Sequence, residues 1–175
     1  MELTSWAIGA VGQIRKELRD DDRWRDALSS SHLNLHRVHL AVFVEPFLSY
    51  VLSGVKSIES RFSTKQCAPF RRVAAGDIIL LKAASGPVKG ICSVAKTWFF
   101  DLRSTPLGRL RERFAESICA TEDAFWVARR NAEYATLIEI ESVRTLSEFS
   151  CPKRDRRGWV VLRGDSGQAT LPTFA

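Results

Sequence analysis

The sequence predicts an α+β fold, in which a small mixed β-barrel has flanking helices and an N-terminal helical extension. Three observations lead to this prediction. Apolar residues recur at helical spacing near the N-terminus, several short segments beyond residue 36 have the apolar patterns of strands, and few helices separate them. The connections within residues 56–100 are too short for parallel crossovers, which disfavours a doubly wound sheet.

Residues 1–33 are expected to form the helical extension. Apolar residues, Trp6 among them, recur there every three or four positions. The acidic run 20–22 interrupts this helix or starts a second one, and residues 29–32 are expected to be a loop. The extension is predicted to pack on the main domain, although Trp6 and Trp24 could instead bury against a protein partner.

The main domain is predicted to span residues 34–165 and to begin with a strand at 38–43. Pro46 suits the first turn of a short helix, and Gly54 follows that helix where a C-cap glycine is expected. Residues 56–63 then alternate as a strand.

The remainder of the main domain alternates strands with a pair of helices. Turn residues and apolar runs predict strands at 78–83, 88–100, 134–146 and 159–162, and helices at 105–119 and from Thr121 onward. Residues 166–175 are expected to be a loose tail.

Charge is distributed unevenly along the chain. The formal net charge is +6, but residues 1–60 hold seven basic and eight acidic side chains, whereas the remainder holds 19 basic and 12 acidic ones. A polyanion such as RNA is the natural partner for this basic excess, and a merely soluble basic protein is the alternative.

Several classes of protein are disfavoured. No apolar run reaches the roughly 20 residues that cross a bilayer, and the N-terminus lacks the basic region of a signal peptide. We therefore expect a cytoplasmic protein with no membrane partner. The four cysteines form no CxxC pair, and His36 and His39 would face opposite sides of a strand, so we predict no metal and no cofactor.

The strongest motif is Gly54-x-Lys56-x-x-Glu59-x-Arg61. Lys56 can contact phosphate or act as a base, Glu59 can accept from a base amino group or act as general acid/base, and Arg61 can pair with phosphate or Glu59. Glu59 and Arg61 share a strand face, but Lys56 joins them only if it lies in the Gly54 turn. The alternative is an ion pair that only stabilises this turn.

With its neighbours, this motif resembles the ASCH family, over about residues 36–163. The matching segments are His39-Leu40-Ala41-Val42-Phe43, Glu45-Pro46-Phe47, the motif itself, Ala68-Pro69-Phe70-Arg71-Arg72-Val73 and Gly76-Asp77-Ile78-Ile79-Leu80-Leu81-Lys82. The resemblance implies a β-barrel of PUA-like, ASCH type. It also implies an RNA-binding cleft between the barrel and its helices.

The resemblance leaves an enzymatic alternative open, because some members of the family are ribonucleases or amidohydrolases that act on acylated cytidine. The amidohydrolase branch has threonine at the position of Glu59 and takes a further glutamate from a later helix, for which Glu116 is the nearest candidate. A hydrolase would then use Lys56, Glu59 and Glu116.

Aromatic and basic side chains outside the motif complete the candidate site. Trp126 lies beside two arginines in a predicted helix, and an aromatic ring next to arginines can stack on a base and bind its phosphate. Burial of that ring in the core is the alternative. The candidate RNA-binding residues are Lys56, Glu59, Arg61, Arg71, Arg72, Trp126, Arg129 and Arg130.

Overall fold

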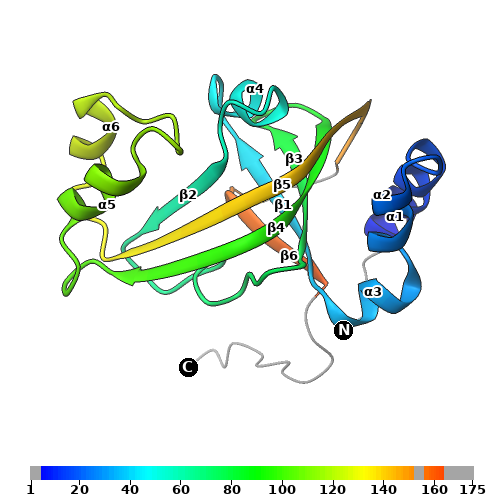
Figure 1. Cartoon of the computed structure of the whole chain (residues 1–175), viewed down its shortest axis with the longest axis horizontal. Helices are drawn as coiled ribbons and strands as arrows, with labels where there is room; N and C mark the ends of the chain where they lie inside the picture. Colours follow the sequence, from blue (N-terminus) through cyan, green and yellow to red (C-terminus); the bar gives the residue numbers. More distant parts are fainter. Residues whose placement is uncertain (1–4, 152–155, 164–175) are drawn as a thin grey trace.

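A computed structural model describes residues 5–151 and 156–163, which form six helices and six strands (Figure 1). Within these residues, no helix is both long and apolar enough to cross a bilayer. The predicted tail at 166–175 lies outside them. The helices are α1 (Ser5–Glu17), α2 (Asp22–Ala27), α3 (Ser30–Leu35), α4 (Phe47–Leu52), α5 (Leu107–Phe114) and α6 (Asp123–Val127). The strands are β1 (Val38–Phe43), β2 (Ile58–Ser63), β3 (Ile78–Ala83), β4 (Val88–Asp101), β5 (Tyr134–Phe149) and β6 (Trp159–Arg163).

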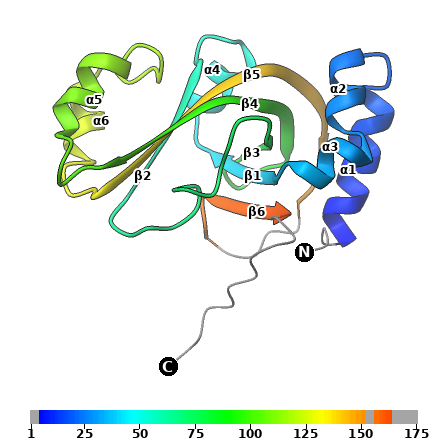
Figure 2. The ribbon, with the colours of Figure 1, turned by 60° about the horizontal axis from the view of Figure 1, so that its bottom comes forward.

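The strands form one curled sheet in the order β2-β5-β4-β3-β1-β6 (Figure 2). Strands β1 and β3 are parallel, and the other neighbours are antiparallel. The prediction of a mixed sheet is therefore confirmed. The prediction of a barrel is only partly right, because β2 and β6 are the two free edges and the sheet remains an open half-barrel.

Alternate residues of the same strands serve two different cores. Ile78 and Leu80 of β3 pack on the outer face of the sheet, whereas Ile79 and Leu81 pack inside the half-barrel beneath α4. The period of two along a strand places successive side chains on opposite faces. This arrangement explains why the first four residues of β3, Ile78 to Leu81, are all apolar, since both faces of the strand are buried there.

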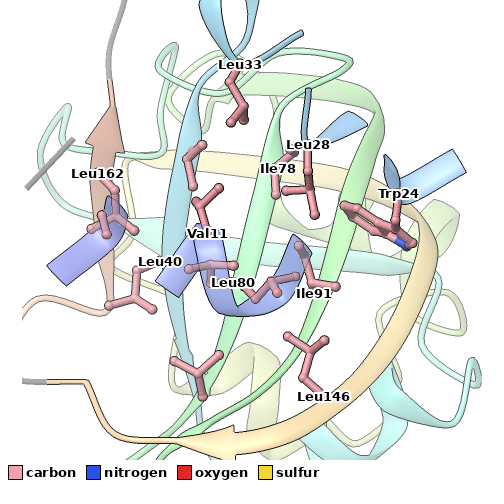
Figure 3. Close-up of a cluster of buried hydrophobic side chains, with 14 residues drawn as sticks. Val11, Trp24, Leu28, Leu33, Leu40, Ile78, Leu80, Ile91, Leu146 and Leu162 are labelled. Carbon is pink, nitrogen blue, oxygen red and sulfur yellow. The ribbon is translucent and has the colours of Figure 1, made fainter. Parts of the chain in front are cut away.

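The three N-terminal helices cover the outer face of the sheet. Val11, Trp24, Leu28 and Leu33 from these helices pack against strand residues in one core (Figure 3). The loop predicted at residues 29–32 is wrong. Ser29 is instead an N-cap, whose hydroxyl accepts from the His32 N–H at 3.2 Å and starts α3.

The two N-terminal tryptophans contact this chain itself. Trp24 is 1% exposed, and its Nε1 donates to the Ser142 carbonyl at 3.0 Å. Ser142 has a positive φ of 54° and lies beside a register shift between β4 and β5, where the β5 strand bends. Trp6 donates to the Ser150 carbonyl and packs near Phe149. These contacts account for both rings without a protein partner.

Helices α5 and α6 cover the other end of the long strands, on the side of the molecule opposite to α1–α3 (Figures 1 and 2). Leu110, Phe114 and Trp126 of these helices pack on Ile58 of β2 and Leu137 of β5. Because β2 is an edge strand, the α5–α6 unit lies beside the open seam of the half-barrel.

We expect Trp24→Ala to lower the free energy of unfolding by about 4 kcal/mol, because it leaves a large cavity in the core between α2 and the sheet. Urea unfolding followed by far-UV circular dichroism measures this loss. The matched control is Leu35→Ala on α3, where the side chain is 76% exposed and the change should stay within about 0.5 kcal/mol. If Trp24→Ala and Leu35→Ala have equal free energies of unfolding, α2 and the sheet do not share a core around Trp24.

Candidate nucleic-acid interface

Lys56 lies in the turn between α4 and β2. Gly54 has a φ of +77°, which ends the helix, and the Lys56 N–H donates to the Tyr50 carbonyl at 2.9 Å. The residue therefore precedes the first strand residue, Ile58. This is the geometry that the sequence required for Lys56 to meet Glu59, and their Nζ and Oε2 atoms lie 3.5 Å apart.

The Lys56 ammonium group is buried, with 2% of the side chain exposed. Its Nζ donates to the Ile118 carbonyl at 2.7 Å and lies 5.3 Å from the centroid of the Phe47 ring. Burial lowers the pKa of Lys56, and the nearby Glu59 carboxylate opposes that shift. The Lys56 ammonium group therefore loses its proton more readily than that of an exposed lysine. Its hydrogen bond to Ile118 also holds the segment between α5 and α6 against the turn before β2.

Arg61 spans the open seam of the half-barrel. From β2 its Nη2 donates to the Val42 carbonyl of β1 at 2.9 Å, and its Nη1 donates to the Gly158 carbonyl before β6 at 3.1 Å. A Cβ on Gly158 would lie 3.1 Å from Nη1, so the close approach favours glycine there. We call these two hydrogen bonds the Arg61 clamp, because they join one edge of the sheet to the strands of the other edge.

Glu59 lies between the two cationic groups. Its Oε1 is 2.7 Å from Nε of Arg61, but that N–H has no aligned acceptor, so the contact is an ion pair without a hydrogen bond. Its Oε2 faces Lys56. The carboxylate is nearly fully buried, and the two cations compensate the cost of burying its charge.

Below the clamp, a buried network supports the Trp159 ring, whose centroid lies 5.3 Å from Cζ of Arg61. Trp159 Nε1 donates to His39 Nδ1 at 3.1 Å, so the His39 proton is on Nε2, 2.9 Å from Oδ2 of Asp77. Asp77 also accepts from the Arg37 and Ala74 N–H groups. No local pattern in the sequence indicates this network, because its members are far apart in the chain.

A cleft of about 540 Å³ opens at this seam, between the β2 edge, the end of β1 and α6. This volume lies in the range of about 300–1,000 Å³ that is typical of small-ligand sites. It is lined by Val42, Phe43, Val44, Phe47, Lys56, Glu59, Ser60, Arg61, Phe62, Phe125, Ala128, Arg129 and Gly158.

Arg129 follows the C-terminal end of α6 and is the charged residue of this segment that lines the cleft. Its Cζ lies 3.4 Å from the centroid of the Phe125 ring and 5.6 Å from that of Phe62, and Nη1 donates to the Phe125 carbonyl at 2.7 Å. Partial burial lowers the pKa of Arg129, and Glu59 opposes this shift. The result is a guanidinium stacked on an aromatic ring at the wall of the cleft.

The predicted site residues divide into two groups. The structure brings Lys56, Glu59, Arg61 and Arg129 together at the cleft. The remaining ones do not line it, and they are Arg71, Arg72, Glu116, Trp126 and Arg130.

The residues outside the cleft have other surroundings. Trp126 is buried and donates to the Ala120 carbonyl at 2.7 Å, so its ring has no face open to a base. Glu116 is exposed and lines a separate polar hollow beside α5, with Arg111 and Thr121. Arg71, Arg72 and Arg130 are exposed, and the guanidinium of Arg71 stacks near Phe70 instead.

The sequence predictions missed the four aromatic rings that line the cleft, which are those of Phe43, Phe47, Phe62 and Phe125. The spacing of Phe125 and Arg129, four residues apart in the segment predicted to be helical from Thr121 onward, was a usable signal, since such pairs lie on the same helical face. Trp126, one residue further on, points away from that face into the core.

Neither the family models nor the curated proteins include a match to this chain. Among solved structures, it is similar to ASCH from Zymomonas mobilis, with 14% identity and a TM-score of 0.58 over 72% of this chain and 87% of that one. This chain has an ASCH-like fold. Two mutants of the same Zymomonas protein align with TM-scores of 0.57 and 0.56. At 14–15% identity, this similarity establishes the ASCH-like fold alone.

We expect Arg61→Ala to lower the free energy of unfolding by about 3 kcal/mol. The change removes two charge-assisted hydrogen bonds across the seam and leaves buried Glu59 with Lys56 alone. Arg61→Lys should recover less than half of this loss, because an ammonium group cannot form the two-pronged contact. Chemical unfolding measures both variants, and full recovery by lysine would contradict the clamp.

Proposed function

We propose that this chain is an RNA-binding module that takes an unpaired nucleotide of a single strand into the cleft at the seam. The observation that carries the proposal is Arg129 stacked on Phe125 at the wall of this cleft. A guanidinium stacked on an aromatic ring offers its other face to a base and its N–H groups to a phosphate. ASCH-like and PUA-like folds are associated with RNA binding, which agrees with the proposal.

The charges of the cleft favour an anionic ligand. Lys56, Arg61 and Arg129 outnumber the one carboxylate that lines it, Glu59. The basic excess of the chain downstream of residue 60 adds a longer-range attraction for a polyanion. Exposed Arg71, Arg72 and Arg130 are candidates for phosphate contacts beyond the cleft.

The cleft residues have different roles in this proposal. Lys56 and Glu59 are buried and paired with each other, so they shape the floor of the cleft and set its potential. Arg61 holds the seam together. Phe125 and Arg129 are half-buried and are the groups that would contact RNA.

We expect Phe125→Ala to weaken binding of a single-stranded RNA oligonucleotide by about 1–3 kcal/mol, because a stacking face is lost. A plot of the logarithm of the binding constant against the logarithm of the salt concentration should be less steep for Arg129→Ala. Its slope should change by about 0.7, the contribution of one phosphate contact. Fluorescence anisotropy at several salt concentrations measures both effects.

The matched control for these variants is Arg19→Ala, which removes one positive charge from an exposed ion pair just after α1, a helix on the side of the molecule opposite to α6. Its affinity should equal that of the unmodified protein. The proposal is wrong if RNA is not retained at low salt, or if Phe125→Ala, Arg129→Ala and Arg19→Ala bind alike.

A hydrolase acting on RNA or on a modified nucleoside is the second candidate function. The observation in its favour is Lys56, whose pKa is lowered by burial and whose amine lies 3.5 Å from a carboxylate oxygen of Glu59. Such a pair can act as base and acid. Glu116 has no part in this version, because it lines a different hollow.

Under the hydrolase hypothesis, the protein converts RNA or acylated cytidine to product, with or without a divalent metal. Glu59→Gln should slow the reaction by at least about 100-fold, because it removes the acid/base group while keeping the side-chain shape. Chromatographic detection of products is the measurement, and Glu116→Gln is the control that should retain the rate. The absence of product with every substrate would reject this hypothesis.

A further inference from the structure

Strand β2 has a free main-chain edge, and the hydrogen bonds on either side of it show which residues face that edge. The Ser57 carbonyl accepts from Ile140 of β5 at 3.0 Å, whereas the Ile58 N–H turns away from β5 to the Ser117 carbonyl at 3.0 Å. Facing direction alternates along a strand. The N–H and C=O groups of Ser60, two residues beyond Ile58, therefore point away from β5.

The cleft reaches this edge. Its lining includes Ser60, Arg61 and Phe62, which are consecutive residues of β2. Their side chains point alternately to opposite faces of the sheet, so one cavity touches all three only where it meets the edge of the strand. On the side of β2 away from β5, the described part of the chain provides no strand that pairs with Ser60.

We infer that the main-chain N–H and C=O of Ser60 hydrogen-bond the Watson–Crick edge of the bound base, which makes Ser60 the residue that restricts the cleft to unpaired bases. This inference rests on the proposed RNA-binding function. Every base has neighbouring donor and acceptor atoms on its Watson–Crick edge, and these are engaged in a duplex but free in a single strand. The edge of β2 then supplies the in-plane contacts, and the Arg129 guanidinium stacked on Phe125 supplies the stacking contact.

An extended peptide is the other ligand that a free strand edge can pair with. Three properties of the cleft favour a nucleotide. It contains a cationic side chain stacked on an aromatic ring, its cationic side chains outnumber the carboxylates, and its volume of about 540 Å³ suits a compact ligand. A strand of peptide needs a long, open edge, whereas the Arg61 clamp crosses this seam immediately beyond Ser60.

The first test removes the Ser60 donor alone. Ser60→Pro lacks the N–H, and proline is accepted at edge strands where that group faces away from the sheet. We expect this variant to bind a single-stranded RNA oligonucleotide about tenfold more weakly, the cost of roughly one unsatisfied hydrogen bond. Ser60→Ala keeps the N–H and should retain more affinity for the oligonucleotide than Ser60→Pro does. Thermal unfolding establishes that both variants are folded.

The second test uses the unmodified protein and alters the ligand, so it does not depend on the folding of a variant. Oligouridine, oligoadenosine and oligocytidine are compared with their N3-methyl, N6,N6-dimethyl and N4,N4-dimethyl forms, which block the Watson–Crick edge without adding charge. We expect binding to fall by about tenfold for the blocked forms. Methylation of uridine and cytidine at C5, and replacement of adenosine by 7-deazaadenosine, should leave affinity unchanged.

The outcomes separate this inference from the function on which it rests. Weaker binding of the blocked bases and of folded Ser60→Pro supports recognition through the β2 edge. If unmodified RNA binds but the blocked bases bind equally well, the role of Ser60 is wrong and the RNA-binding function stands. If no RNA binds, both the RNA-binding function and the role of Ser60 are wrong. If Phe125→Ala loses RNA binding but Ser60→Pro does not, recognition depends on stacking and not on the edge of β2.

Discussion

The Arg61 guanidinium is the contact on which the shape of the half-barrel depends. A six-stranded sheet with two free edges has no hydrogen-bond ladder to hold those edges together. The Arg61 clamp replaces that ladder with two charge-assisted hydrogen bonds, to the Val42 and Gly158 carbonyls. Because the clamp is a side chain and not a strand, the seam keeps a cavity beside it, and the cleft exists where a closed barrel would have paired β2 with β6.

The strands around this seam need cover on their outer face, and the helices at the two ends of the molecule supply it. Apolar residues on the outer face of β1 and β3 are buried only because α1–α3 lie on them. Helices α5 and α6 bury the outer face of β2 and β5 in the same way, and α6 with the turn after it also brings Phe125 and Arg129 to the cleft. Packing and the candidate site are therefore coupled through α6, and the N-terminal helices contribute to stability from the opposite side.

Local patterns in the sequence were sufficient to predict most elements and the meeting of Lys56 with Glu59, since the Gly54 turn, the alternation of Glu59 with Arg61 and the apolar runs all depend on near neighbours. The rest depends on contacts between distant segments. The partners of Arg61 include a carbonyl at residue 158, and the open seam results from pairings that no local pattern encodes. On α6 both Phe125 and Trp126 are aromatic, so only tertiary packing decides which ring faces the cleft.

The burial of Lys56 beside Glu59 is difficult to explain by stability alone. Desolvation lowers the pKa of this amine, and a buried ion pair is often no more stabilising than an apolar pair of the same volume. Beneath a cleft, however, the same groups have a second effect. Together with Arg61 and Arg129 they give the cavity a positive potential in a low-dielectric setting, where charge acts over longer distances than in water. We therefore interpret the buried ionic cluster as a feature that favours an anionic ligand at the seam, at some cost in stability.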